Sequence, residues 1–312
     1  MSEEVKDSLV NEKAEPEQAT EQEQTVEQEE ASEQAEKPKL PNLRIPEPNR
    51  FSIVQKVIAV VSGKGGVGKS LVTGLMSVLM NRRGYKVSII DADMTGPSVP
   101  KMFGVKEKMI YNQFGIVPGK TENGIQMVSV NMILDDETDP VIWRGSMMNA
   151  ALKQFWTEVV WREVNYMFVD MPPGTGDVPL TVFQTLPIAG IIVVTSPQEL
   201  VSMVVTKAVK MAEMMDIPIL GIVENMSYLS CPDCNKEIRL FGESHIDEIA
   251  SKHSLPILGK IPLDPKLATL CDAGRIEDFE GEWLDKAAEV LSTVWDLPLI
   301  ETVELTDILP EQ

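Results

Sequence analysis

The sequence predicts an α/β fold in which a doubly wound, mostly parallel sheet carries helices on both faces. Three observations predict this fold: short runs rich in valine and isoleucine recur, segments with helical apolar spacing separate them, and a glycine-rich turn follows the first run. Strands of a parallel sheet are buried on both faces, so they read as nearly continuous apolar runs. Alternation of such strands with helices is typical of a doubly wound domain.

The individual elements follow from these two periodicities. The runs that we interpret as strands are residues 56–62, 86–90, 126–130, 166–170, 190–195 and 219–223. The segments whose apolar residues recur at helical spacing are residues 69–83, 150–163, 199–215 and 283–295. We therefore expect one domain over residues 50–298.

Charge is distributed unevenly along the 312 residues. The net charge is −20, and residues 1–36 hold 13 acidic side chains against Lys6 and Lys13, a net of −11. With few apolar residues, such a stretch cannot offset the entropy lost on ordering. We expect residues 1–49 to be a disordered acidic tail with a proline-rich linker, and residues 299–312 to be an acidic C-terminal tail. A solubilising role is favoured over a specific docking role for the first tail.

Several classes of function are disfavoured by composition. The rest of the chain carries the remaining −9, whereas a broad nucleic-acid surface needs clustered lysine and arginine. The N-terminus lacks a basic start before an apolar core, and the apolar runs are too short to cross a bilayer. Three cysteines without an export signal indicate the reducing cytoplasm. We expect a cytoplasmic protein without nucleic-acid or membrane partners.

A phosphate-binding loop follows the first predicted strand. Its residues are Gly63, Lys64, Gly65, Gly66, Val67, Gly68, Lys69 and Ser70. Glycines let the backbone wrap around a phosphate, and the amides and dipole of the next helix attract its charge. Lys69 is expected to contact the β and γ oxygens of ATP, and Ser70 to bind Mg²⁺. The alternative, a glycine-rich turn without a ligand, is disfavoured by the strand before it.

Carboxylates at the ends of two other predicted strands fit the same site. Asp170 ends an apolar strand and is suited to hold Mg²⁺ through water, and the loop at 172–176 follows it. Asp91 and Asp93 close the strand that begins at Lys86, so at least one of them should point toward the attacking water. A helix cap or a turn is the alternative for either assignment taken alone.

A second lysine near the start of the loop narrows the class. With Lys64 and Lys69 together, the loop resembles the deviant Walker A motif of the MinD, ParA and nitrogenase-reductase ATPases. The resemblance implies a nucleotide-sandwiched dimer in which Lys64 touches the phosphates bound by the partner. It would then stabilise transition-state charge in trans, as an arginine finger does. A solvated loop lysine is the alternative.

Seven segments of the sequence narrow the class to one family. They are residues 63–70, 91–98, 170–177, 196–198, 224–227, 231–234 and 259–265. In these segments and in their order, the chain resembles the Mrp (ApbC) iron–sulfur carrier ATPases over about residues 55–279. The resemblance implies that Asn225 reads the adenine edge and that Asp93 positions the hydrolytic water.

A Cys-x-x-Cys pair lies in one of these segments. Cys231 and Cys234 can bind one metal centre from a tight turn, since thiolates suit both iron–sulfur clusters and zinc. A cubane cluster normally takes four cysteines, and Cys271 alone cannot complete the set. Two subunits related by a two-fold axis would supply four, so we expect a homodimer with a bridging cluster, expected to be [4Fe-4S], and apo iron–sulfur proteins as acceptors.

Other functions stay open for these residues. The pair alone fits a zinc knuckle or a thiol–disulfide switch as well as a cluster, and the family resemblance favours the cluster. For the whole chain, the alternative functions are a MinD/ParA-like positioning ATPase and a zinc-binding metallocentre chaperone. MinD-like proteins use a basic amphipathic C-terminal helix to bind membranes, whereas residues 300–312 hold no basic residue. Cys271 is expected to be an inert packed thiol.

Overall fold

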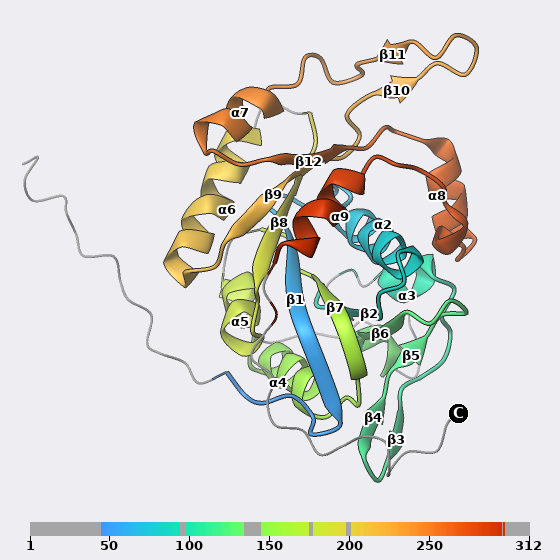
Figure 1. Cartoon of the computed structure of the whole chain (residues 1–312), viewed down its shortest axis with the longest axis vertical. Helices are drawn as coiled ribbons and strands as arrows, with labels where there is room; N and C mark the ends of the chain where they lie inside the picture. The colour runs from blue at the N-terminus through green and yellow to red at the C-terminus, as the bar shows by residue number, and fades with distance from the viewer. Residues whose placement is uncertain are drawn as a thin grey trace, which may run out of the picture. The chain divides into compact units, whose positions relative to one another are not determined.

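An eight-stranded sheet forms the centre of the fold (Figure 1). The computed structural model describes residues 45–93, 96, 98–133, 145–174, 177–197, 201–294 and 296. The strand order is β12-β9-β8-β1-β7-β2-β6-β5, and the pairings are parallel except for the antiparallel pair β5–β6. The strands are β1 (Ser52–Ser62), β2 (Val87–Asp91), β5 (Gly119–Lys120), β6 (Gln126–Ser129), β7 (Arg162–Asp170), β8 (Gly190–Thr195), β9 (Ile219–Glu224) and β12 (Ile257–Lys260).

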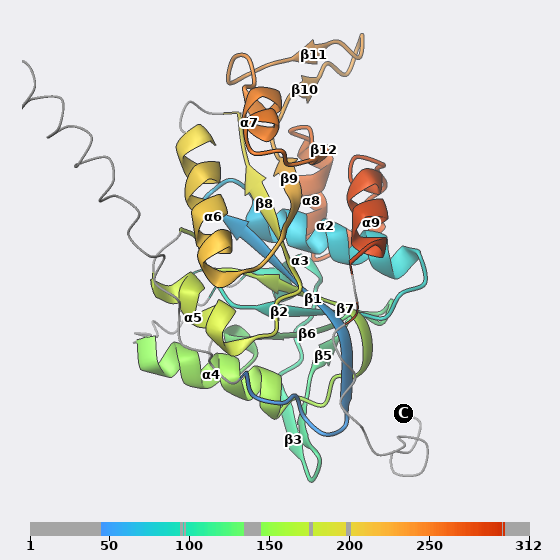
Figure 2. The same ribbon diagram turned by 60° about the vertical axis from the view of Figure 1, so that its left-hand side comes forward.

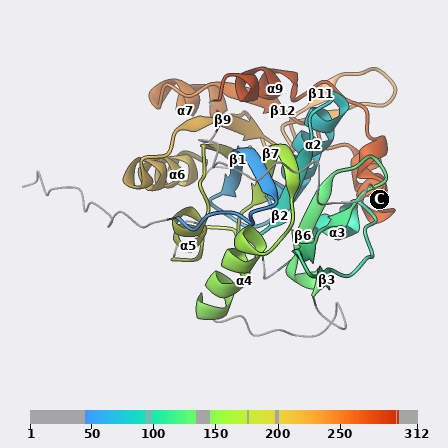
Figure 3. The ribbon, with the colours of Figure 1, turned by 60° about the horizontal axis from the view of Figure 1, so that its bottom comes forward.

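Helices cover both faces of this sheet (Figure 3). They are α2 (Lys69–Arg82), α3 (Val99–Met102), α4 (Gly145–Thr157), α5 (Asp177–Thr185), α6 (Val201–Met215), α7 (Ile246–Lys252), α8 (Pro265–Asp272) and α9 (Asp285–Ser292). Two short 3-10 helices are η1 (Val130–Met132) and η2 (Ile276–Asp278). Two small hairpins stand apart from the sheet, β3–β4 (Ile110–Asn112, Gly115–Val117) and β10–β11 (Leu229–Ser230, Glu237–Ile238).

The two faces of the sheet each pack in a separate apolar core. Because side chains alternate along a strand, Val57 and Ala59 of β1 pack with α4, α5, α6 and α7, while Ile58 and Val60 pack with α2, α3, α8 and α9. These four residues of β1 are fully buried. Burial on both faces explains why the strands appear as apolar runs, and it confirms the predicted doubly wound fold.

Each of the six predicted strands is present, and one predicted helix is wrong at its C-terminal end. The helix expected over 150–163 ends at Thr157, and β7 begins at Arg162. Arg162 has a positive φ of 55°, which a helix does not accommodate, and it pairs with Ser52 of β1. The helix expected over 199–215 is α6, with residues 199–200 outside the described residues. The helix expected over 283–295 is α9, which is shorter than predicted and spans Asp285–Ser292.

The parallel strands end together at one edge of the sheet. Asp91 at the end of β2 is in register with Asp170 at the end of β7, and Asp170 is in register with Val60, two residues before β1 ends at Ser62. Loops after parallel strands share one edge of a sheet, which is where ligands bind in this architecture. The predicted site residues therefore converge there.

Candidate nucleotide site and cysteine hairpin

The glycine-rich loop connects β1 to α2, as the sequence predicts. Gly66 and Gly68 have positive φ values of 84° and 81°, in the left-handed region that glycine adopts without strain. Gly68 is the N-cap of α2, and Lys64, Gly65 and Gly66 are exposed. The first amides of α2 have no partner within the helix, so the loop presents donors and a positive dipole end to an anion.

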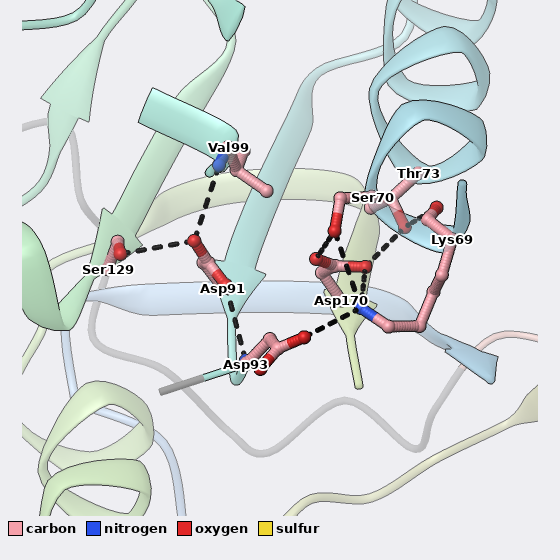
Figure 4. Close-up of polar contacts among 8 residues, drawn as sticks. All are labelled: Lys69, Ser70, Thr73, Asp91, Asp93, Val99, Ser129 and Asp170. Atoms are coloured by element: carbon pink, nitrogen blue, oxygen red, sulfur yellow. Dashed lines mark hydrogen bonds and ion pairs between the residues drawn. The ribbon is translucent and has the colours of Figure 1, made fainter. Parts of the chain in front are cut away.

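The buried carboxyl group of Asp170 joins the end of β7 to the first turn of α2 (Figure 4). Its oxygens accept hydrogen bonds from Lys69 Nζ at 2.6 Å and from Ser70 Oγ at 2.5 Å. Thr73 Oγ1 donates a third bond at 3.0 Å. Thr73 was not identified from the sequence, although its position one turn after Lys69 on α2 places it beside the same carboxyl group.

The two aspartates after β2 lie in different environments (Figure 4). Asp93 faces the loop, with a carboxylate oxygen 3.7 Å from Lys69 Nζ. Asp91 is fully buried and accepts hydrogen bonds from Ser129 Oγ at 3.1 Å, from the Asp93 amide at 3.2 Å and from the Val99 amide at 3.4 Å. Asp91 therefore fastens both ends of the segment 93–99, of which residues 94, 95 and 97 lie outside the described residues.

Burial is the main reason that the pKa of Asp91 rises to about 8, and the nearby negative charge of Asp170 raises it further. The Lys69 charge and the bonds from Val99 and Ser129 act in the opposite direction. Of the two aspartates, the structure brings Asp93 to the lysine, and Asp91 supports its backbone. Ser129, the partner of Asp91 on β6, gave no signal in the sequence.

Asn225 contacts the phosphate loop from the end of β9. It directly follows β9, it is 1% exposed, and its Nδ2 donates a hydrogen bond of 2.9 Å to the carbonyl of Val67. A Cβ at Gly68 would lie 2.1 Å from that Nδ2, so the contact requires glycine there. Asn225 is thus held against the loop, at the edge where the strands end.

Cys231 and Cys234 lie at the turn of the β10–β11 hairpin, which projects beyond the sheet at the top of Figure 2. The turn is closed by hydrogen bonds from the Cys231 amide to the Lys236 carbonyl at 3.0 Å and from the Asn235 amide to the Cys231 carbonyl at 2.9 Å. The amides of Asp233 and Cys234 lower the pKa of the Cys231 thiol, which favours the metal-binding thiolate.

This hairpin holds two cysteine thiols rather than four. Within the part of the chain that the structure describes, no group of three or more histidine, cysteine, aspartate or glutamate side chains is arranged to hold a metal ion. Cys271 lies on α8, packed against the apolar core, and burial raises the pKa of its thiol. Its environment fits the expected packed thiol.

The oxygens of Ser70 and Asp170 fit a magnesium ion. They are hard donors only 2.5 Å apart, so one small divalent cation can contact both, directly or through water. A strand, a glycine-rich turn, a helix that begins with lysine and serine, and a buried carboxylate on the neighbouring strand together define a P-loop nucleotide hydrolase.

Comparison with known proteins identifies the family within this class. The family model described as NUBPL iron-transfer P-loop NTPase, of the ParA group, matches residues 53–295. An iron–sulfur cluster carrier protein of Clostridium perfringens is 43% identical over 240 residues, covering 74% of this chain and 84% of that protein. One of Methanocaldococcus jannaschii is 44% identical over 226 residues, covering 72% and 78%. The chain therefore belongs to the NUBPL iron-transfer P-loop NTPase family.

Solved structures agree with this assignment. A nucleotide-binding protein of Archaeoglobus fulgidus in complex with ADP has a TM-score of 0.68 at 42% identity, and the match covers 74% of this chain and 90% of that one. The cell division ATPase MinD of Pyrococcus furiosus has a TM-score of 0.52 at 20% identity, which shows a shared fold. The predicted class and family are thus confirmed.

Proposed function

We propose that this chain binds and hydrolyses ATP and carries an iron–sulfur cluster, held between two copies of the chain, to apo iron–sulfur proteins. The observation that carries the proposal is the pair of thiols of Cys231, partly exposed, and Cys234, exposed, which is half of the ligand set of a cluster. They lie on the hairpin that follows β9, the strand that ends beside the phosphate loop. The iron–sulfur carriers at 43% and 44% identity support it, and they do not favour a positioning ATPase.

The nucleotide site divides into several roles. The amides of residues 63–70 hold the phosphates, and the Lys69 ammonium contacts the β and γ oxygens. Ser70 and Asp170 would hold Mg²⁺, which supplies positive charge to the phosphates. Asp93 orients the water that attacks the γ-phosphate, and its position beside Lys69 supports this role.

Two further residues complete the nucleotide site. Asn225 reads the adenine edge, for which its buried position at the phosphate loop is suitable. Lys64 lies exposed at the start of the loop, from where it reaches the phosphates bound by the partner copy. It would stabilise charge there only when two copies enclose the nucleotide.

Cluster binding depends on the hairpin. Two copies place Cys231 and Cys234 opposite their symmetry mates, and the four thiolates complete a [4Fe-4S] ligand set. The lowered pKa of the Cys231 thiol favours the thiolate, which is the form that binds metal. A zinc ion is the competing occupant, because four thiolates also suit zinc.

The rest of the chain is assigned by composition. Residues 1–49 are an acidic tail and linker, 50–298 the ATPase domain and 299–312 a second acidic tail; residues 1–44 and 297–312 lie outside the described residues. In the described ranges, no helix is both long and apolar enough to cross a bilayer. The proposed location is the cytoplasm, without nucleic-acid or membrane partners.

Cluster transfer to an apoprotein tests the function. The chain is loaded anaerobically with iron and sulfide, and activation of an apo [4Fe-4S] enzyme is followed with and without Mg-ATP. We expect activation by the wild type and none by a Cys231→Ser/Cys234→Ser variant. Matched Cys271→Ser protein should activate like the wild type. Zinc without iron or sulfide in anaerobically purified protein would instead identify a zinc site.

A further inference from the structure

Glu224, the last residue of β9, has a carboxyl group that neither the nucleotide site nor the cysteine pair uses. It is completely buried, and its two oxygens accept hydrogen bonds from Ser227 Oγ, at 2.5 Å, and from Ser244 Oγ. Burying a carboxyl group is unfavourable unless its hydrogen bonds are satisfied, so two dedicated hydroxyl donors mark a specific arrangement.

The two serines stand at the two ends of the cysteine segment. Ser227 precedes β10, Ser244 follows β11, and residues 228–243 between them include the hairpin with Cys231 and Cys234. From residue 232 to residue 243 the segment is exposed throughout, so few packed side chains hold it in place. One carboxyl group therefore fastens both ends of an otherwise exposed loop to the end of β9.

The same strand end is attached to the phosphate loop. Asn225, next to Glu224, donates from Nδ2 to the Val67 carbonyl at 2.9 Å. The backbone amide of Asn225 donates a hydrogen bond of 2.8 Å to the carbonyl of Thr195 on β8. The backbone amide of Ile261 donates one of 2.8 Å to the carbonyl of Glu224. A displacement of the phosphate loop would thus be transmitted through Asn225 to the backbone of Glu224. From there it would be transmitted through the Glu224 carboxyl group to both ends of the hairpin segment.

We propose that Glu224 is a positioning residue that couples the nucleotide state of the phosphate loop to the position of the cysteine hairpin, through its bonds to Ser227 and Ser244. The consequence of this coupling, a change in how tightly the cysteines bind a cluster, rests on the proposed function. The coupling itself can be measured on the chain without any cluster. Met226, between Asn225 and Ser227, has a positive φ of 56°, so the connection turns sharply and is short.

Hydrogen exchange tests the coupling without any cluster. Exchange of amides 228–243 is compared in the full chain with and without a non-hydrolysable Mg-ATP analogue, for the wild type and for Ser227→Ala/Ser244→Ala. In the wild type the analogue should change the exchange rates at least ~3-fold, and in the double variant less than ~1.5-fold. Glu224→Gln, which can still accept one hydroxyl and donate to the other, should keep most of the response.

The controls separate coupling from general damage. Ser251→Ala removes a hydroxyl whose hydrogen bond, to the Asp247 carbonyl, lies within α7, and this variant should respond like the wild type. If the double variant unfolds, the single variants Ser227→Ala and Ser244→Ala replace it in the test. Each leaves one hydrogen bond to Glu224 and should show a reduced response. The proposal is overturned if the analogue does not change amide exchange in the wild-type hairpin, or if it changes exchange in the double variant as much as in the wild type.

Cluster transfer gives the functional readout. The ratio of transfer rates with and without Mg-ATP should approach one in the double variant, while its nucleotide affinity stays near that of the wild type. Failure of the wild type to transfer any cluster would remove the proposed function and leave the exchange result standing. Normal transfer with an unchanged ATP ratio in the double variant would remove the coupling alone.

Discussion

Asp170 at the end of β7 accepts a 2.6 Å hydrogen bond from the ammonium of Lys69, the first residue of α2. The carboxyl group is fully buried and the lysine side chain is 5% exposed, so each charge compensates the other. The lysine assigned to the phosphates therefore also stabilises the contact between the sheet and the helix.

Replacing Lys69 by alanine should destabilise the fold as well as weaken nucleotide binding. Removing one partner of a buried ion pair leaves an uncompensated charge, which costs about 3 kcal/mol. Urea unfolding without nucleotide measures the loss. Lys64→Ala is the matched control, because this exposed lysine should contribute little to stability. Equal unfolding free energies for Lys69→Ala and the wild type would contradict the pairing.

Lys64→Ala should separate hydrolysis from binding. A positive charge supplied in trans acts on the transition state, so the ATPase rate should fall about 100-fold or more while ATP affinity changes little. Rates and affinities are measured at several protein concentrations. Mixing Lys64→Ala with a hydrolysis-deficient Asp93→Asn variant should restore partial activity. A Lys64→Ala rate equal to that of the wild type would refute action across a dimer.

Gly68→Ala should be more harmful than Gly84→Ala. Both glycines have a positive φ, 81° and 88°, so alanine at either position costs about 1 kcal/mol of backbone strain. Only at Gly68 would the new Cβ meet Asn225, at 2.1 Å, whereas nothing lies within 4 Å at Gly84. Nucleotide affinity should therefore fall for Gly68→Ala alone. Identical behaviour of the two variants would argue against the loop contact of Asn225.

Asp91→Asn should change how stability depends on pH. The folded pKa, about 8, lies above the unfolded value, so the folded state holds this proton more tightly. Ionisation then opposes folding, and the contribution of Asp91 to stability declines from about pH 4 to about pH 8 and is level above that. The difference in unfolding free energy between the wild type and Asp91→Asn should fall over this range. A constant difference would contradict the burial effect.

The fold could be read from the sequence because the apolar runs and the glycine-rich loop encode it locally. Motif spacing predicted that Asp170, Lys69 and Ser70 share one site, but it did not predict the direct hydrogen bonds among them. The partners Thr73 and Ser129 were not predicted, since a single hydroxyl among apolar neighbours has no local pattern. The end of α4 was misjudged because the apolar residues 159–161 fit a helix or a strand equally well, and pairing of β7 with β1 decides the outcome.

The contacts of Glu224 with the two serines could not be predicted from the sequence either. Glu224 belongs to a segment that resembles the family, but its partners are three and twenty residues away and meet it only in the folded chain. Long-range polar contacts of this kind depend on tertiary packing, which periodicity does not reveal.

In the proposed function, two copies of the chain share one cluster through Cys231 and Cys234. Anaerobic reconstitution, followed by light scattering and iron and sulfide analysis of the same fractions, tests it most directly. We expect a dimer with about four iron atoms per two chains, and a Cys231→Ser/Cys234→Ser protein without iron. Iron bound by monomers, or bound equally well after both cysteines are replaced, would contradict it.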